Sequence, residues 1–268
     1  MFANTIQPGI ISLFSSTGGH PLELFAVHVD DALPEDSAVL LLNDSEIEPK
    51  APPPTTLIRP PALRKASESP QASSRDVLEE GYTLCHTVLH IQSPTLRTTY
   101  IRCPASSDTD LGIRLPRMHV QVRSLGRAFS LEVGVVDVSG VHGSVRCSTF
   151  QKEPNVSTSH TKRPPVLHLP LCFLDFNKHP LTSWTTISLD LAALITQFTV
   201  LSRKSSSDSE GDENLAQPAA PFPSPQFASV SYVKVYANCR LRRIWFSNSR
   251  TVNSDELPWE FKLYSSNS

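Results

Sequence analysis

The segment 232–247, which reads YVKVYANCRLRRIWFS, holds the densest block of β-forming residues in the chain. Val233 and Val235 alternate with polar and aromatic neighbours, and this period of two is typical of a half-buried strand. Asn238 and Cys239 interrupt the run before apolar residues resume it. The pattern therefore predicts two strands joined by a tight turn, although the turn lacks the Asn-Gly pair that is typical of hairpins.

The second of these strands does not separate its apolar and basic residues by simple alternation. Strict alternation from Leu241 would place Arg243 on the face of Trp245, so either both faces are partly covered or a β-bulge resets the register. We favour a bulge. The strand also carries the tightest basic cluster, whose guanidinium groups can pair with carboxylates of this chain or of a partner, namely Arg240, Arg242 and Arg243. A solvated face with internal ion pairs is the more ordinary interpretation.

Much of the remaining sequence is typical of short strands with turns between them. Clean alternation in the run 111–125 sends one set of side chains inward, Met118, Val120 and Val122, and the other outward, His119, Gln121 and Arg123. Asp190 is a suitable N-cap for one short helix, LAALITQF at 191–198. Several strands and one helix predict an all-β sandwich rather than a βαβ enzyme fold.

Composition divides the chain into one folded domain and two insertions. Pro (23) far outnumbers Gly (10), and the prolines cluster in two polar stretches. Residues 30–77 form the first stretch and residues 202–226 the second, and we expect both to be disordered because they cannot bury enough apolar surface. The expected domain is a single β-sandwich made of residues 1–29, 78–201 and 227–268.

One apolar run stands out within the first insertion. Residues 38–42 read AVLLL, which is unusual in a polar, proline-rich segment. Its central residues, Val39, Leu40 and Leu41, form a candidate docking segment, either on the domain itself or on a partner. The insertions are either partner-binding segments or tolerated loops, and we favour tolerated loops for the first half of each, since long surface insertions cost little free energy.

The net charge of −2 hides a division between these parts. Residues 30–77 hold nine acids and five bases, and residues 202–226 hold four acids and two bases, which leaves 17 of the 24 bases and 13 of the 26 acids elsewhere. The expected domain is thus mildly basic and suits an acidic partner, but its excess is too small to indicate nucleic acid. Three serines of the second insertion precede an acid by three residues and are candidate phosphorylation sites, Ser205, Ser207 and Ser209.

The sequence contains no signal peptide and no apolar run of the roughly 20 residues that span a bilayer, so we expect a soluble, intracellular protein. Its five cysteines are odd in number and widely spaced. They are expected to be reduced, buried small residues rather than disulfides or metal ligands, at Cys85, Cys103, Cys147, Cys172 and Cys239.

Motifs of catalysis are missing from the sequence. It has no HExxH, CxxC, GxGxxG, P-loop or GxSxG pattern. His119 and His168 fall on expected strand faces, where a surface or core histidine is the ordinary interpretation. Asp108 and Asp110 precede Leu111-Gly112 and are better explained by a solvated turn than by a calcium loop. We therefore expect no enzyme activity, no metal and no cofactor.

Five blocks of the sequence closely resemble the cilia- and flagella-associated protein twenty family, in the same order. They are MFxNTxQxG at the start, TTYIxCPA at 98–105, LGIxLP at 111–116, YANCRLRRIWFS at 236–247 and DELPWEFKLY at 255–264. The resemblance covers nearly everything outside the two insertions. It implies a jelly-roll-type β-sandwich with a short helix, which agrees with the strand pattern.

The resemblance also implies a structural role rather than catalysis. Family members sit in the axoneme of cilia and flagella, at the inner junction of doublet microtubules. There they bridge the A-tubule and B-tubule by contacting α/β-tubulin, beside a parkin co-regulated protein and other microtubule inner proteins. The family's basic block maps onto Arg240, Arg242 and Arg243, and with Arg117 and Arg123 these are the expected contacts to acidic tubulin.

The insertions and the diluted positive charge depart from the family pattern. They suggest either a lineage-specific member or a divergent paralogue at another lattice position, such as the centriole or basal body. A nuclear RNA- or DNA-associated factor is a second class, weakly permitted by the basic domain. A carbohydrate-binding module is a third class, because jelly-roll sandwiches frequently bind glycans, but it requires an exposed aromatic platform.

Overall fold

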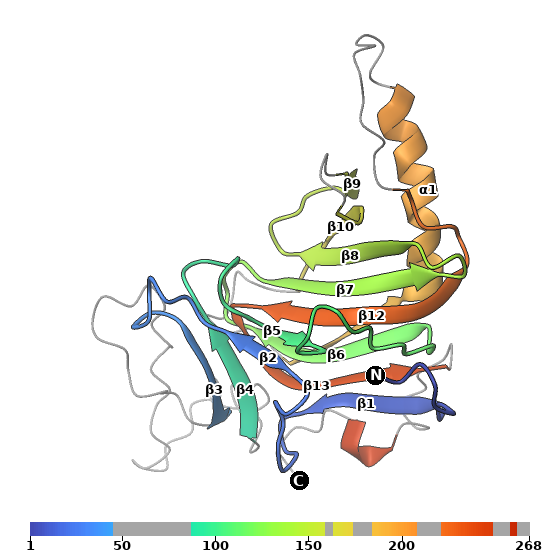
Figure 1. The fold of residues 1–268 in the computed structure, drawn as a ribbon. Helices are drawn as coiled ribbons and strands as arrows, with labels where there is room; N and C mark the ends of the chain where they lie inside the picture. The colour runs from blue at the N-terminus through green and yellow to red at the C-terminus, as the bar shows by residue number, and fades with distance from the viewer. Residues whose placement is uncertain (45–86, 159–162, 174–183, 208–220, 249–257, 262–268) are drawn as a thin grey trace, which may run out of the picture.

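The computed structural model describes residues 1–44, 87–158, 163–173, 184–207, 221–248 and 258–261. Within these residues, two β-sheets pack face to face around one hydrophobic core, and one long helix stands at one end (Figure 1). The predicted all-β sandwich is confirmed. Within the described part of the chain, no helix combines the length and apolarity that a bilayer-spanning helix requires.

The first sheet, sheet A, has six strands that all pair antiparallel. Its order is β11-β6-β13-β4-β3. Both β4 and β1 pair with the edge of β13 that faces away from β6, β4 with the first half of β13 and β1 with the second half. Its strands are β1 (Ile10–Ser15), β3 (Ala38–Asn43), β4 (Thr87–Gln92), β6 (Arg117–Ser124), β11 (Thr185–Asp190) and β13 (Cys239–Ser247).

The second sheet, sheet B, has seven strands in the order β2-β5-β12-β7-β8-β10-β9. All its pairs are antiparallel except β8 with β10. Its strands are β2 (Ala26–His28), β5 (Tyr100–Cys103), β7 (Ser130–Asp137), β8 (His142–Ser148), β9 (Asn155–Ser157), β10 (Val166–Pro170) and β12 (Phe227–Tyr236).

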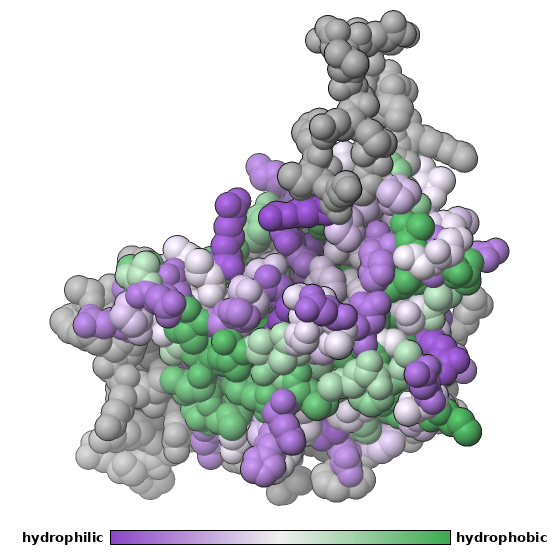
Figure 2. All heavy atoms as spheres, in the orientation of Figure 1, coloured by the Kyte–Doolittle hydropathy of each residue, from purple (hydrophilic) through white to green (hydrophobic). Residues whose placement is uncertain are grey.

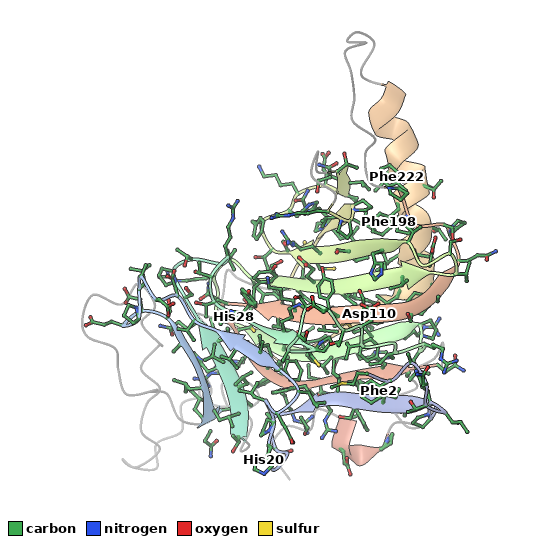
Figure 3. All side chains as sticks on the ribbon, in the orientation of Figure 1. Phe2, His20, His28, Asp110, Phe198 and Phe222 are labelled. Carbon is green, nitrogen blue, oxygen red and sulfur yellow. The ribbon has the colours of Figure 1, made fainter. Side chains whose placement is uncertain are left out.

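The helix α1 (Leu191–Ser207) packs its first turns against the sandwich core. Asp190 caps it as predicted, since its Oδ1 accepts a hydrogen bond from the Ala193 backbone N–H at 3.1 Å. Leu191, Ile195 and Phe198 recur at helical spacing and are buried, and Figure 3 shows Phe222 next to Phe198 of the helix. The helix runs beyond the predicted end at 198 and takes in the first residues of the second insertion.

The two strands of the segment 232–247 do not form a hairpin, which corrects the prediction. β12 pairs with β5 and β7 in sheet B, whereas β13 pairs with β6, β4 and β1 in sheet A. Asn238 lies between them, accepts a bond from the Ser93 backbone N–H at 3.0 Å and donates to the Ala128 carbonyl at 3.1 Å. The connection therefore passes from sheet B to sheet A, and its Asn238 bonds to two other loops instead of closing a turn.

The predicted bulge in β13 is confirmed, since its register with β6 shifts between Leu241 and Arg243. After the shift, Ile244 and Phe246 join Leu241 in the core, while Trp245 stacks on the opposite face against His119 of β6. One extra residue thus allows Leu241, Ile244 and Phe246 to share the core face of the strand.

Met118, Val120 and Val122 point into the core as predicted, but His119, Gln121 and Arg123 are buried rather than solvated. A second layer covers this outer face of sheet A. It includes the short 3-10 helix η2 (Trp259–Phe261), whose Phe261 carbonyl accepts a bond from the Gln121 side chain at 2.6 Å. Alternation identifies the apolar face of a strand, but it does not show whether other chain segments cover the polar face.

The first insertion begins later than predicted. The Asp30 carboxylate accepts hydrogen bonds from the hydroxyls of Thr95 (2.5 Å) and Thr98 (2.7 Å), which hold its pKa below the ordinary value. The AVLLL run forms β3, which pairs with β4 over its whole length. The candidate docking segment Val39, Leu40 and Leu41 therefore docks on the chain's own sheet. Residues 45–86 and 208–220 lie outside the described residues.

Candidate interaction face

Two of the arginines expected to contact a partner are instead buried against one carboxylate. Arg123 Nη1 lies 3.0 Å from Asp44 Oδ2, and Arg240 Nη1 lies 2.8 Å from Asp44 Oδ1. The Trp184 indole N–H donates to the same carboxylate at 2.7 Å. Arg123 is 1% exposed and Arg240 is 4% exposed. The expectation that these two arginines face a partner is therefore wrong, because their counter-charge lies inside the chain.

The other three arginines also bond within the chain. Arg243 Nη1 lies 3.8 Å from Glu260 Oε2, and the guanidinium lies over the Phe261 ring at 4.6 Å. Arg242 Nη1 donates to the Gln121 side-chain oxygen at 2.5 Å, and Arg117 Nη2 pairs with Asp190 Oδ2 at 2.7 Å. Arg243 is buried, whereas Arg117 and Arg242 are half-buried. Sheet A thus uses its arginines largely for its own packing.

The two histidines considered as ligands lie on different sheets and bond to serine hydroxyls. His119 bonds to Ser188 Oγ (2.8 Å) and Ser247 Oγ (2.9 Å), and burial lowers its pKa to about 4. His168 bonds to Ser157 Oγ at 2.9 Å on the other sheet. Throughout the described ranges, no group of three or more His, Cys, Asp and Glu side chains is placed to hold a metal ion.

The cysteines that the structure describes are not paired in disulfides. Burial raises the pKa of the Cys103 and Cys147 thiols to about 12, and it raises that of Cys239 as well. These three are inert core residues, as predicted. Cys172 is exposed, which corrects its expected burial, and Cys85 lies outside the described residues.

The outer face of sheet B presents an aligned row of ionisable side chains. Strand register places one residue from each of the seven strands in this row. Five successive members are polar and ionisable, and only one of them is acidic. In order across the sheet, the row is Ala26, Arg102, Lys234, Glu132, Arg146, His168 and Asn155.

Glu132 is the anchor of this row. Its carboxylate accepts bonds from Arg146 Nε at 2.5 Å, from the Tyr232 hydroxyl at 2.6 Å and from the Tyr236 hydroxyl at 3.3 Å. Burial and the neighbouring carboxylate both raise the pKa of the two phenols. They therefore remain donors at neutral pH, and the carboxylate of Glu132 is fully engaged by its own chain.

Tyrosine rings support the three cations of the row. The Lys234 ammonium lies 3.5 Å from the Tyr100 ring centroid and 4.6 Å from that of Tyr236. Arg102 lies 5.1 Å from the Tyr232 ring, and Arg146 lies 5.6 Å from the Tyr236 ring. These distances are in the range of cation–π attraction. We name the set the cation–tyrosine face: Arg102, Lys234, Arg146, Glu132, Tyr100, Tyr232 and Tyr236.

Part of this face was visible in the sequence. The alternation that sent Val233 and Val235 inward also placed Tyr232, Lys234 and Tyr236 together on the other side of one strand. The pairing of that strand with β5 and β7 was not visible. Arg102, Glu132 and Arg146 therefore could not be connected with it.

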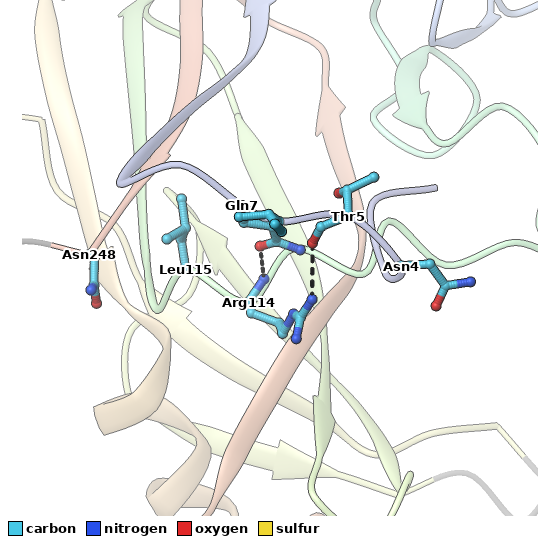
Figure 4. A pocket seen from close by; sticks show the side chains of 7 residues that line it. Asn4, Thr5, Gln7, Arg114, Leu115 and Asn248 are labelled. Atoms are coloured by element: carbon cyan, nitrogen blue, oxygen red, sulfur yellow. Dashed lines mark hydrogen bonds between the residues drawn. The ribbon is translucent and has the colours of Figure 1, made fainter.

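A second feature is the N-terminal arm, which lies along the loop before β6 (Figure 4). The Gln7 side chain donates to the Gly112 carbonyl at 2.7 Å and accepts from the Arg114 backbone N–H at 2.7 Å. Arg114 Nη2 donates to the carbonyls of Ala3 and Thr5, each at 3.1 Å. An open cleft of about 570 Å³ lies beside this contact. The arm and the loop thus hold each other in place.

A third feature is an apolar patch at the end of the molecule where β2 and β3 lie (Figure 2). Leu24, Val27 and Leu41 are each between 36% and 43% exposed. An open cleft of about 460 Å³ runs between Leu41 and the loop 19–23. Exposed apolar side chains that gather in one region are typical of contact surfaces.

Comparisons with known proteins identify relatives along nearly the whole chain. The family model described as the CFA20 domain matches residues 75–200 and 214–265. The Cilia- and flagella-associated protein 20 of Chlamydomonas reinhardtii is 27% identical over 264 residues, which cover 98% of this chain and 97% of that protein. Proteins of the same name from Caenorhabditis elegans and Paramecium tetraurelia are each 24% identical over 98% of this chain. The matched region covers 91% of the Caenorhabditis elegans protein and 96% of the Paramecium tetraurelia protein. The match to the family model includes every residue of the cation–tyrosine face.

Proposed function

Because the chain belongs to the CFA20 domain family, we propose that it is a cilia- and flagella-associated protein and a non-enzymatic structural component of axonemal doublet microtubules. In this proposal it bridges the A-tubule and B-tubule at the inner junction by binding tubulin. The parkin co-regulated protein and other microtubule inner proteins are its proposed neighbours. The observation that carries the proposal is the family match, which includes strands of both sheets.

The architecture supports a bridging role. A bridge must be stiff and must present more than one contact surface. The sandwich is stiff because its polar outer layer is tied by internal ion pairs, such as the Asp44 cluster, as well as by its core. The cation–tyrosine face suits an acidic partner such as tubulin, and the patch around Leu24, Val27 and Leu41 suits an apolar one.

The perturbed ionisable groups support a structural rather than a catalytic role. A displaced pKa inside a cleft is a common sign of an active site. Here the low pKa values of His90 and His119 arise mainly from burial within sheet A, and both imidazoles bond to neutral side chains. The carboxylate of Glu132 is engaged by Arg146 and two phenols. Each of these groups is explained by packing.

Microtubule co-sedimentation tests the proposal directly. The full-length protein is incubated with intact microtubules and with microtubules whose acidic tubulin tails have been removed. We expect saturable binding that weakens as salt is added, because opposite charges on exposed surfaces are screened. Parallel imaging of the tagged protein in ciliated cells should show it along the axoneme. The absence of both tubulin binding and axonemal signal would contradict the proposal, and signal confined to centrioles would favour the paralogue alternative.

The predicted arginine cluster provides an informative variant for this assay. Alanine at Arg240, Arg242 and Arg243 together should reduce folding rather than remove a tubulin contact, since all three bond internally. Circular dichroism and a denaturation curve on the same sample distinguish these outcomes. A variant that is fully folded but no longer binds microtubules would restore the arginines as contacts.

A further inference from the structure

Lys234 has an unusual position at the centre of the cation–tyrosine face. Its ammonium group lies over the rings of Tyr100 and Tyr236, yet it makes no hydrogen bond or ion pair with any residue that the structure describes. Aromatic rings attract a cation, but they do not replace the acceptors that its three N–H donors require. The half-buried side chain is therefore held in place with its donors available.

Neighbours in the row do not neutralise this charge. Register places Arg102 directly opposite Lys234 on β5, and like charges in that position destabilise a sheet. Arg102 itself donates to the backbone carbonyls of Pro104 (2.6 Å) and Ser106 (2.9 Å), which carry no charge. Glu132 lies opposite Lys234 on β7, but its carboxylate is bonded to Arg146 and two phenols. The central pair of cations thus lacks a carboxylate of its own.

We propose that the cation–tyrosine face binds an acidic polypeptide segment, with a carboxylate of the partner bonded to Lys234 and shared with Arg102. The carboxylate supplies the acceptor that Lys234 lacks and separates two like charges. Tyr100 and Tyr236 hold the ammonium in position, so little side-chain freedom is lost on binding. This inference rests on the proposed function for its partner, an acidic surface of tubulin, and on the geometry of sheet B for its chemistry.

The same geometry disfavours a glycan or a single-stranded nucleic acid as the occupant. Both ligands stack on uncovered aromatic rings. Tyr100 has His28 stacked on it at 4.4 Å and Lys234 over it at 3.5 Å. His28 and Lys234 lie on the strands on either side, so both sides of the ring are occupied. The Tyr232 and Tyr236 rings are also covered by cations, so no bare platform is offered.

The electrostatics of Lys234 agree with this assignment. Burial lowers the pKa of its ammonium, and the charges of Arg146 and Arg102 lower it further, while Glu132 acts in the opposite direction. A bound carboxylate reverses this trend, because an opposite charge close by favours the protonated form. Binding and protonation of Lys234 therefore support each other.

Fluorescence anisotropy with a labelled decaglutamate peptide tests the inference on the full-length protein. Lys234→Met keeps most of the side-chain volume and removes the charge, and Arg102→Gln removes the second cation. Each substitution should weaken the affinity for the peptide by about tenfold or more, equivalent to about 1.4 kcal/mol of binding free energy. Lys152→Met is the matched control, because Lys152 is an exposed lysine in the loop after β8. It should bind the peptide like the wild type, and decaglutamine should not bind measurably.

Two results would overturn the inference. One is equal peptide affinity of wild type, Lys234→Met and Arg102→Gln, each shown to be folded by circular dichroism. The other is a wild type that binds decaglutamate no better than decaglutamine. The microtubule assay separates the two proposals. If Lys234→Met binds microtubules normally, the proposed function stands and the cation–tyrosine face is excluded as the tubulin contact. If the peptide binds through Lys234 but microtubules do not, the surface stands and tubulin is excluded as its partner.

Discussion

Arg240 and Asp44 lie 196 residues apart in the sequence, yet one Nη1 of Arg240 donates to both the carboxylate and the backbone carbonyl of Asp44, each at 2.8 Å. Asp44 directly follows β3, and Arg240 lies on β13 near the middle of sheet A. The contact fastens the outermost strand of the sheet to its interior. Arg123 and Trp184 bond to the same carboxylate, so four distant segments meet at one point.

Replacing Asp44 should therefore destabilise the fold strongly. Asp44→Asn removes the negative charge that pairs with the buried Arg123 and Arg240, and we expect a loss of about 3–5 kcal/mol in the free energy of unfolding. Urea denaturation followed by circular dichroism measures this change. Asp31→Asn, at an exposed position, is the control and should stay within about 0.5 kcal/mol of the wild type. A small effect at Asp44 would mean that the two arginines find other partners.

Gly112 offers a test of the contact between the N-terminal arm and its loop. Its φ is +69°, and an added Cβ would lie 2.7 Å from the backbone nitrogen of Ala3. Gly140 has a similar φ of +79°, but nothing lies within 4 Å of an added Cβ. Gly140→Ala should cost about 1–2 kcal/mol from backbone strain alone.

Gly112→Ala should cost more than Gly140→Ala and should also release the arm. Thermal denaturation gives the difference between the two variants. Hydrogen exchange at the Phe2 amide, which donates to the Leu111 carbonyl at 2.6 Å, reports on the arm. Equal stability and equal Phe2 protection in the two variants would show that the arm adapts to the added methyl group.

Stability should decrease in mild acid because of two buried histidines. Burial lowers the pKa of His90 and of His119 from the ordinary value of 6.5 to about 4 in the folded state. Between these values the unfolded chain takes up protons that the folded chain does not, so unfolding is favoured as the pH falls from 6.5 to 4. Each group contributes up to about 1.4 kcal/mol per pH unit in this window.

Denaturation curves at several pH values measure this slope. The double variant with His90→Gln and His119→Gln should show a much flatter dependence between pH 6.5 and 4, whatever its stability at neutral pH. A slope that is unchanged in the double variant would assign the acid sensitivity to other groups.

Glu132→Gln should lower the stability of the fold but raise its affinity for the acidic peptide. The substitution removes the negative charge to which Arg146 and the phenols donate, and we expect a loss of about 1–3 kcal/mol in stability. It also raises the net charge of the cation–tyrosine face by one, so the affinity for decaglutamate should increase. Weaker peptide binding by a folded Glu132→Gln would instead indicate that Glu132 positions the cations.

Local patterns in the sequence predicted local structure well. The bulge in β13 followed from the need to bury Ile244 and Phe246 together with Leu241, and Asp190 marked the start of the helix. Both features depend on neighbours within a few residues. The β3 segment was noticed for the same reason, because five apolar residues are conspicuous among polar ones.

Long-range pairing was the part that the sequence did not reveal. β12 and β13 are adjacent in the chain but belong to different sheets, since Asn238 bonds to Ser93 and Ala128 rather than closing a turn. The arginines of sheet A were expected at the surface because nothing local identified Asp44 as their counter-ion. Lys234 was visible on its strand, but the strands that place Arg102 and Glu132 beside it were not.

The crossing at Asn238 also affects how the protein is made. β12 lies between β5 and β7 in one sheet, and β13 lies between β6 and β4 in the other, so one late segment supplies an interior strand to both. A nascent chain that has not reached residue 227 can complete neither sheet, and the apolar faces of its earlier strands stay open to water and to other chains. Neither sheet can be completed before residues 227–247 have been synthesised, and until then the open apolar faces favour aggregation.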